Sequence, residues 1–289
     1  MAPNLIYLIA KGEVFGERQP LVLHLIDTPN HTNTVRGVAM EFMDSGFPLL
    51  KDCIATNKLS EAFEDIDVAF LLPYPDLTVQ KSRLEKLGER LSLAKLHGEA
   101  LNLYAKKTVK VVVVGHYANI WTIICSQFAP TIPAENFTGV SRFVQNFAAS
   151  LLSLRLRVRV EDIKDIIVWG NYSEKMHTDL CHATVKMPLA DKETGVYVAM
   201  KNDHWLKGEY NEIIHETTFD VSDNKRCISM AVSAAEHMRD WWQGTKPDQL
   251  TSMIVVSNGA YDVPKGLFFS FPVVIKDKKW KILEVKGFS

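Results

Sequence analysis

One short stretch restricts the folds open to this chain more than any other. Residues 109–114 read Val-Lys-Val-Val-Val-Val and stop at Gly115. A near-continuous run of β-branched residues that a glycine ends is typical of a strand buried on both faces, as in a parallel sheet. Other strand patterns at residues 21–26, 53–55 and 68–72 alternate with helical patterns at residues 35–43 and 79–104. This alternation predicts an α/β domain with a largely parallel sheet.

The pattern changes in the second half of the chain. A helix is expected at residues 142–156, and an apolar run at residues 163–169 predicts a buried strand that stops at Gly170-Asn171. Further strands are expected at residues 182–187, 253–257, 267–275 and 280–285, with helices at residues 206–215 and 225–242. Asp277-Lys278-Lys279 should join the last two strands as a hairpin. We therefore predict a doubly wound domain over residues 1–141 and an α+β region with antiparallel strands over residues 142–289.

Composition excludes several classes of partner. The formal net charge of −1 gives no general attraction to nucleic acid or to an anionic membrane. No apolar run approaches the roughly 20 residues that a membrane helix needs. The four cysteines are widely scattered, with no CxxC pair, which fits reduced thiols better than a disulfide framework. The cytoplasm is the expected compartment.

One group of possible metal ligands lies close together in the sequence. It consists of His177, Asp179, Cys181 and His182. Their spacing does not match the usual pairs of zinc ligands, so we expect no metal site.

The strand that stops at Gly170-Asn171 resembles the strand–Gly-Asn–His segment of the cytosolic-type malate dehydrogenases, within the lactate/malate dehydrogenase superfamily. The resemblance covers nearly the whole chain. It includes Glu13-Val14-Phe15-Gly16, Leu49-Leu50-Lys51-Asp52, Tyr104-Ala105-Lys106-Lys107, Trp205-Leu206-Lys207-Gly208-Glu209 and Ser270-Phe271-Pro272-Val273-Val274-Ile275-Lys276. It implies a Rossmann-like doubly wound sheet, an α+β substrate domain and NAD-dependent interconversion of malate and oxaloacetate.

The catalytic positions that the resemblance implies hold unsuitable residues. The catalytic histidine falls on Tyr172, and an ordinary tyrosine, with a pKa of about 10, is a poor proton acceptor at neutral pH. The aspartate that orients the histidine falls on Val144, and a substrate arginine falls on Phe147. The first arginine of the mobile loop falls on Leu77, while the second is matched by Arg83, the one remaining candidate for substrate binding.

The cofactor side keeps two candidate residues. The resemblance places Asp27 at the tip of the second strand, where a carboxylate accepts hydrogen bonds from the adenosine ribose, although an aspartate there is also a common turn former. Asn119 matches an asparagine of the family. The glycine-rich loop and first strand are absent from the sequence, and the chain ends before the family's C-terminal helix. We therefore expect no cofactor, or NAD if any is bound.

His116 stands near Asn119, where the family has another asparagine. It is either a relocated base or a hydrogen-bonded loop histidine. We favour the loop histidine, because a base also needs an orienting partner and a substrate clamp.

Three interpretations of function stay open. The first is a catalytically inert family member that acts through protein contacts; the second is an active NAD-dependent dehydrogenase with altered site residues; the third is a truncated gene product or splice form. The resemblance implies a homodimer, or a heterodimer with a related chain, through the helix at residues 35–43. Its apolar stripe comprises Val35, Val38, Ala39, Phe42 and Met43. Without a first strand, the strands at residues 21–26 and 109–114 should each have an open edge.

Overall fold

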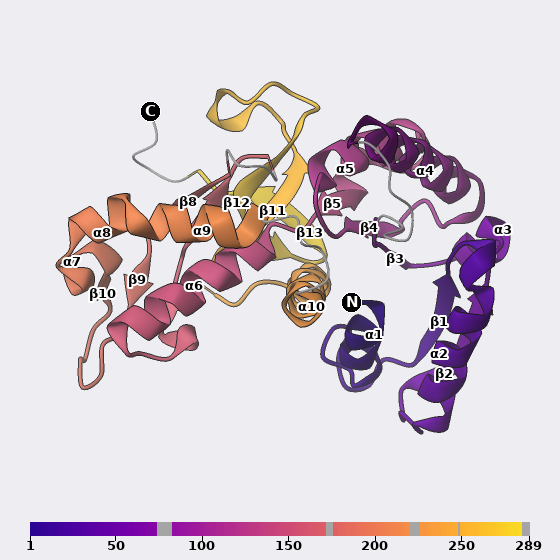
Figure 1. The fold of residues 1–289 in the computed structure, drawn as a ribbon, viewed down its shortest axis with the longest axis horizontal. Coiled ribbons are helices and arrows are strands. Elements are labelled where there is room, and N and C mark those ends of the chain that lie inside the picture. Colours follow the sequence, from indigo (N-terminus) through magenta and orange to yellow (C-terminus); the bar gives the residue numbers. More distant parts are fainter. Residues whose placement is uncertain (74–82, 172–175, 220–225, 248, 285–289) are drawn as a thin grey trace.

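The computed structural model describes residues 1–73, 83–171, 176–219, 226–247 and 249–284 (Figure 1). The first half contains, in chain order, α1 (Ala2–Ala10), β1 (Leu21–Ile26), α2 (Thr32–Asp44), β2 (Leu50–Thr56), α3 (Leu59–Phe63), β3 (Val68–Leu71), α4 (Arg83–Tyr104), β4 (Lys110–Val113), α5 (Ala118–Gln127) and β5 (Phe137–Gly139). The second half contains α6 (Arg142–Leu156), β6 (Ile163–Lys164), β7 (Ile167–Trp169), β8 (His177–Asp179), β9 (Thr184–Val185), β10 (Thr194–Gly195), α7 (Val196–Met200), α8 (Asp203–Lys207), α9 (Glu209–Phe219), α10 (Cys227–Gln243), β11 (Thr251–Val256), β12 (Phe268–Lys276) and β13 (Lys279–Ile282).

A six-stranded sheet forms the centre of the molecule, in the order β13-β12-β11-β5-β4-β3. Strand β4 is parallel to both of its neighbours, and Val111, Val112 and Val113 have 0% exposure. The run of valines therefore forms the buried strand that the sequence predicts. The sheet also continues across residue 141, because Gly139 in β5 pairs with Ile254 in β11. The α/β class with antiparallel strands in the second half is thus confirmed.

A separate two-stranded parallel sheet contains β1 and β2. It has its own small core, formed by Ile6, Ala39, Phe42, Leu50 and Cys53. Helix α1 connects the two cores, because Ile6 packs in the small one while Leu5 and Ile9 pack in the large one.

One of the two predicted open edges is in the wrong place. In the described chain β1 pairs with β2 alone, so its other edge is open as expected. Strand β4, however, lies between β3 and β5. The second open edge belongs to β3, because β3 begins the second half of the doubly wound order and lies nearest the position between the two halves.

The predicted strand at residues 163–169 is divided in two. Asp165 has a φ of +59°, which breaks the extended backbone between β6 and β7. Strand β6 pairs with β9, whereas β7 pairs with β8. The strand expected at residues 182–187 shortens to β9, and the helix expected at residues 206–215 divides at Gly208 into α8 and α9.

The predicted hairpin is confirmed. Lys276 pairs with Lys279, and the two residues between them, Asp277 and Lys278, have φ values of +52° and +59°. Two left-handed residues are the geometry of a type I′ turn, which matches the twist of antiparallel strands.

Candidate functional site

The candidate site lies where the chain leaves β4 and β7. After β4, Gly115 and Tyr117 have φ values of +128° and +63°, and this sharp turn leads into α5. The guanidinium of Arg90, on α4, lies over the Tyr117 ring at 5.5 Å from its centroid. This cation–π contact fixes the turn against α4.

Asn119, in the first turn of α5, connects this turn to the end of β7. Its side chain is 5% exposed. The amide nitrogen Nδ2 donates to the carbonyl oxygen of Phe268 at 2.8 Å and to Oδ1 of Asn171 at 3.2 Å. The structure therefore brings Asn119 together with the Gly170-Asn171 segment.

Two buried serines hold β7 in place, and the sequence analysis did not identify them. The hydroxyl of Ser270 donates to the carbonyl of Val168 at 2.6 Å, and the backbone nitrogen of Val168 donates to the hydroxyl of Ser252 at 2.9 Å. Both serines have 0% exposure. The available signal was Ser270 within the apolar strand β12 and Ser252 beside Thr251 at the start of β11, since a buried polar group needs a partner.

Helix α6 contributes the positions that the resemblance gives to the orienting aspartate and the substrate arginine. Val144 has 0% exposure and belongs to the large core, and Phe147 is half-buried against that core. Neither side chain has an atom that could orient an imidazole or hold a carboxylate. This face of α6 is occupied by packing.

Other predicted site residues lie partly or wholly outside the described residues. Tyr172 and Leu77 fall in segments 172–175 and 74–82, which are not described. Arg83 is the first residue of α4, and its side chain is likewise outside the description. His116 lies partly exposed in the turn after β4 and makes an interaction there.

Asp27 follows β1, as predicted, and acts locally. Its Oδ1 accepts a hydrogen bond from the Thr28 nitrogen at 2.7 Å and lies 3.5 Å from Nδ1 of His31. These contacts are those of a turn former.

These two residues do not fit a NAD site on their own. Both amide hydrogens of Asn119 are used within the chain, and Asp27 supplies one exposed carboxylate.

Asp179 is the centre of the group of possible metal ligands. Its carboxylate is 2% exposed, accepts a hydrogen bond from the Cys181 nitrogen at 2.7 Å and lies 3.2 Å from Nδ1 of His182. These contacts close the turn after β8. Within the described part of the chain, no set of three or more His, Cys, Asp or Glu side chains could hold a metal ion.

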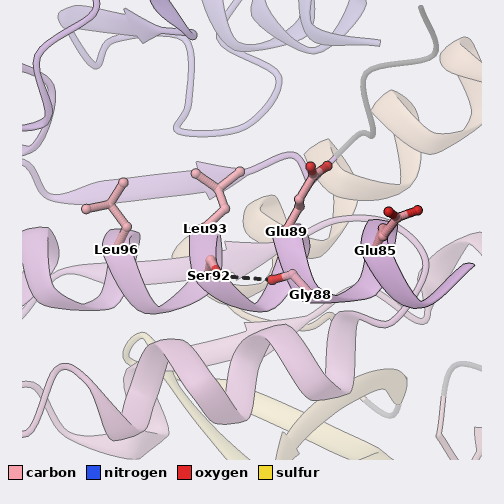
Figure 2. Close-up of a pocket in the computed structure, with 6 residues that line it drawn as sticks. All are labelled: Glu85, Gly88, Glu89, Ser92, Leu93 and Leu96. Atoms are coloured by element: carbon pink, nitrogen blue, oxygen red, sulfur yellow. Dashed lines mark hydrogen bonds between the residues drawn. The ribbon is translucent and has the colours of Figure 1, made fainter. Parts of the chain in front are cut away.

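A groove of about 520 Å³ lies on α4, apart from this site (Figure 2). Figure 2 shows the side chains of Glu89, Leu93 and Leu96 pointing from one face of the helix. The described residues that line the groove belong to α4, and none of the candidate site residues with a described side chain is among them. No described helix has the length and apolar character needed to cross a membrane.

Comparison with known proteins agrees with this architecture. The family model for the lactate/malate dehydrogenase alpha/beta C-terminal domain matches residues 145–288. The cytoplasmic malate dehydrogenase of Gallus gallus is 44% identical over 98% of this chain and 86% of the relative, and that of Homo sapiens is 43% identical with the same coverage. The structure of Trichomonas vaginalis lactate dehydrogenase in complex with NADH and oxamate has a TM-score of 0.90 and 31% identity, over 99% of this chain and 87% of that chain. Malate dehydrogenase from Naegleria fowleri has a TM-score of 0.89 and 29% identity, over 100% of this chain and 87% of that one.

The fold and the Gly170-Asn171 segment define a dehydrogenase-type architecture, with a doubly wound parallel sheet and a C-terminal α/β domain that carries antiparallel strands. The chain belongs to the lactate/malate dehydrogenase family, among its cytoplasmic malate dehydrogenases.

Proposed function

We propose that this chain is a malate dehydrogenase family member that does not turn over malate or oxaloacetate, and that it acts in the cytoplasm through protein contacts. The observation that carries the proposal is Val144, which is wholly buried on α6 where the family resemblance places the orienting carboxylate. We also propose that the boundary between the dinucleotide-type and substrate-type regions lies at residue 141, where the sequence pattern changes.

The chemistry explains why this position matters. Oxidation of a secondary alcohol needs a base that takes the hydroxyl proton while hydride leaves, and the charged base needs an orienting acceptor. Tyr172 stands at the position of the base and is a poor acceptor at neutral pH. Val144 cannot supply the acceptor, and Phe147 cannot replace the bidentate fork of an arginine.

Weak or absent NAD binding is part of the proposal. A dinucleotide needs backbone or side-chain donors for its pyrophosphate and an acceptor for its ribose. Asn119 has both amide hydrogens committed to Phe268 and Asn171. Asp27 alone is too little to hold the cofactor.

A second candidate function is active NAD-dependent malate dehydrogenation with altered site residues. It is favoured by the relatives, since those of chicken and human are named cytoplasmic malate dehydrogenases. A structural relative is also described as a complex with NADH and oxamate. In this case Arg83 would be the residue to bind the substrate carboxylate, and Asp27 and Asn119 would contact the cofactor.

Two measurements on the purified chain separate these candidates. NADH absorbance with oxaloacetate should show no turnover, and calorimetric titration with NADH should show no saturable heat. A cooperative unfolding transition establishes that the sample is folded, and added cytoplasmic malate dehydrogenase of Gallus gallus verifies the reagents. Turnover within a hundredfold of ordinary dehydrogenases, about 2.7 kcal/mol in barrier height, overturns the proposal.

A further inference from the structure

One lysine of the central sheet is half-buried and lacks an anionic partner. Lys110 is the first residue of β4, and its backbone nitrogen donates to the carbonyl oxygen of Asp67 at 3.0 Å. Its ammonium lies over the ring of Trp241, with Nζ 4.5 Å from the ring centroid. Among the residues that the structure describes, no oxygen accepts a hydrogen bond from this ammonium and no carboxylate forms an ion pair with it. A charged group that is partly removed from water usually has such a partner.

Two acids on the elements around Lys110 are bound to other cations. The carboxylate of Asp67 lies 2.9 Å from Nζ of Lys106. The carboxylate of Asp240, on α10, lies 2.9 Å from the guanidinium of Arg142. These two acids therefore do not neutralise Lys110.

The hairpin between β12 and β13 brings two further lysines close to Lys110. The indole nitrogen of Trp241 donates to the carbonyl oxygen of Lys278 at 3.2 Å, which attaches the turn to α10. The ammonium of Lys278 lies over the ring of Trp242, with Nζ 3.3 Å from its centroid. Burial, and then the positive charges of Lys278 and Lys279, lower the pKa of Lys110 to about 8.

The Lys110 amine is therefore a nucleophile near neutral pH. At about pH 7.4, roughly a fifth of amines with this pKa are neutral, against roughly one in a thousand for an ordinary lysine. The Trp241 ring favours the charged form, but burial and the two like charges outweigh this contact. The Nζ atom keeps some contact with solvent, so a small molecule can reach it.

The two neighbouring ammonium groups favour one kind of reaction product. An amide formed from an activated acyl group is neutral and gains little from two positive neighbours. A Schiff base formed from an aldehyde becomes positive when it is protonated, and the neighbours oppose that charge. A carbamate formed from carbon dioxide is an anion, which both ammonium groups attract.

We propose that Lys110 is a modification site for carbon dioxide, held as a carbamate beside Lys278 and Lys279. The neutral amine nitrogen attacks the carbon of CO2 and an N–C bond forms. One C=O π bond gives its electron pair to an oxygen, and the nitrogen releases one proton to the solvent. The side chain changes from positive to negative, so it exchanges the contact with Trp241 for attraction to two cations. The inference is independent of the proposed function.

The test uses the whole chain at about pH 7.4 with isotopically labelled carbon dioxide. Triethyloxonium ion converts a carbamate to a stable ester, and mass spectrometry of peptides then locates the label. Three variants are compared with wild type: Lys110→Arg, the double variant Lys278→Gln, Lys279→Gln, and Lys95→Gln. The last is the matched control, because Lys95 lies on α4 in an exposed pair with Glu99. Thermal scans verify that each variant is folded.

We expect about tenfold or more label on Lys110 than on the exposed lysines Lys95 and Lys281. Lys110→Arg should remove this label, and Lys95→Gln should leave it unchanged. The double variant should reduce it about fivefold or more, because loss of the two charges both raises the pKa of the amine and weakens the carbamate. If the double variant does not fold, Lys279→Gln alone, at an exposed position, should reduce the label about twofold.

Three results overturn the proposal. The first is label spread evenly over exposed lysines, and the second is full label on Lys110 in a folded variant without the neighbouring charges. The third is fast acetylation of Lys110 by acetic anhydride without any trapped carbamate, because the amine would then be nucleophilic but unable to hold carbon dioxide. None of these measurements involves NADH or malate, so this proposal and the proposed function can fail separately.

Discussion

The side-chain amide of Asn119 donates to the carbonyl oxygen of Phe268 at 2.8 Å, which ties α5 to β12 across 149 positions of sequence. Replacement by alanine removes this donor from the buried carbonyl of Phe268, and also removes the bond to Asn171, which is exposed. We expect Asn119→Ala to lower the free energy of unfolding by about 1–3 kcal/mol in urea titrations.

A control separates this structural role from a cofactor role. Asn57 is exposed and donates one hydrogen bond to Thr32, so Asn57→Ala should change stability by less than about 0.5 kcal/mol. If Asn119→Ala kept wild-type stability and altered NADH binding instead, the cofactor interpretation would replace the structural one.

Arg142 connects α6 to α10 through ion pairs. Its side chain is 11% exposed, with guanidinium nitrogens 2.9 Å from Asp240 and 3.5 Å from Glu236. Arg142→Met removes one partner of a nearly buried group of charges, which costs about 3 kcal/mol, at the low end of the usual range because Arg239 still bonds Asp240. Urea unfolding measures the loss. Arg159→Met, at an exposed pair with Asp162, is the control and should leave the midpoint almost unchanged.

His237 makes stability depend on pH. It is 1% exposed, lies with Nε2 2.9 Å from the Thr138 hydroxyl, and burial, assisted by the charge of Arg142, lowers its pKa to about 3. The folded state keeps this histidine neutral while the unfolded state protonates it below about pH 6.5. The unfolded state therefore binds more protons, so stability falls as pH drops from about 6.5 toward 3, by about 2 kcal/mol at pH 5.

Comparison with a variant isolates this contribution from other titrating groups. The free energy of unfolding of His237→Gln and of wild type is measured in urea titrations at pH 7 and at pH 5. The difference between the two proteins should be about 2 kcal/mol smaller at pH 5 than at pH 7. His177→Gln, at an exposed position on β8, should leave the pH dependence as it is. A wild-type-like slope in His237→Gln would contradict the assignment.

The sequence predicts those elements correctly that residues close together in the chain determine. The valines of β4, the bounds of α6 and the Asp277-Lys278 turn all follow from runs, periodicity and turn chemistry within a few residues. The break at Asp165 did not, because a left-handed aspartate inside an apolar run leaves the hydrophobic pattern intact.

For the candidate site, sequence placed Val144 on a helix and Asn119 after a strand. It could not identify the partners that decide their roles. The bond from Ser270 to Val168 spans 102 positions, and such pairs are set by tertiary packing.

The apolar stripe of α2 packs mainly on its own sheet. Ala39 and Phe42 are buried against β1 and β2, with Val38 packed beside them, while Met40 and Met43 are 66% and 41% exposed. A dimer through this helix therefore has to use the methionines.

We expect the chain to be a dimer at micromolar concentration in light scattering. The double variant Met40→Asp, Met43→Asp should be a monomer, and its unfolding midpoint in thermal scans should be unchanged. Phe42→Asp instead should lower stability, because it buries a charge. A monomeric wild type, or a double variant that stays dimeric, rejects this surface.

Histidine at position 172 alone should not create malate dehydrogenase activity. Tyr172→His supplies an imidazole with a suitable pKa, but Val144 gives it no acceptor and Phe147 gives the substrate no clamp. NADH absorbance with oxaloacetate should stay at background. The triple variant Tyr172→His, Val144→Asp, Phe147→Arg supplies the base, its acceptor and one clamp, and leaves Leu77 at the position of a loop arginine. An aspartate at a position with 0% exposure loses its hydration and must find its partner in the new histidine. A folded triple variant, verified by cooperative unfolding, should therefore exceed the single variant in turnover. Activity in the single variant equal to that of the triple would show that the chain orients its base through a group other than residue 144.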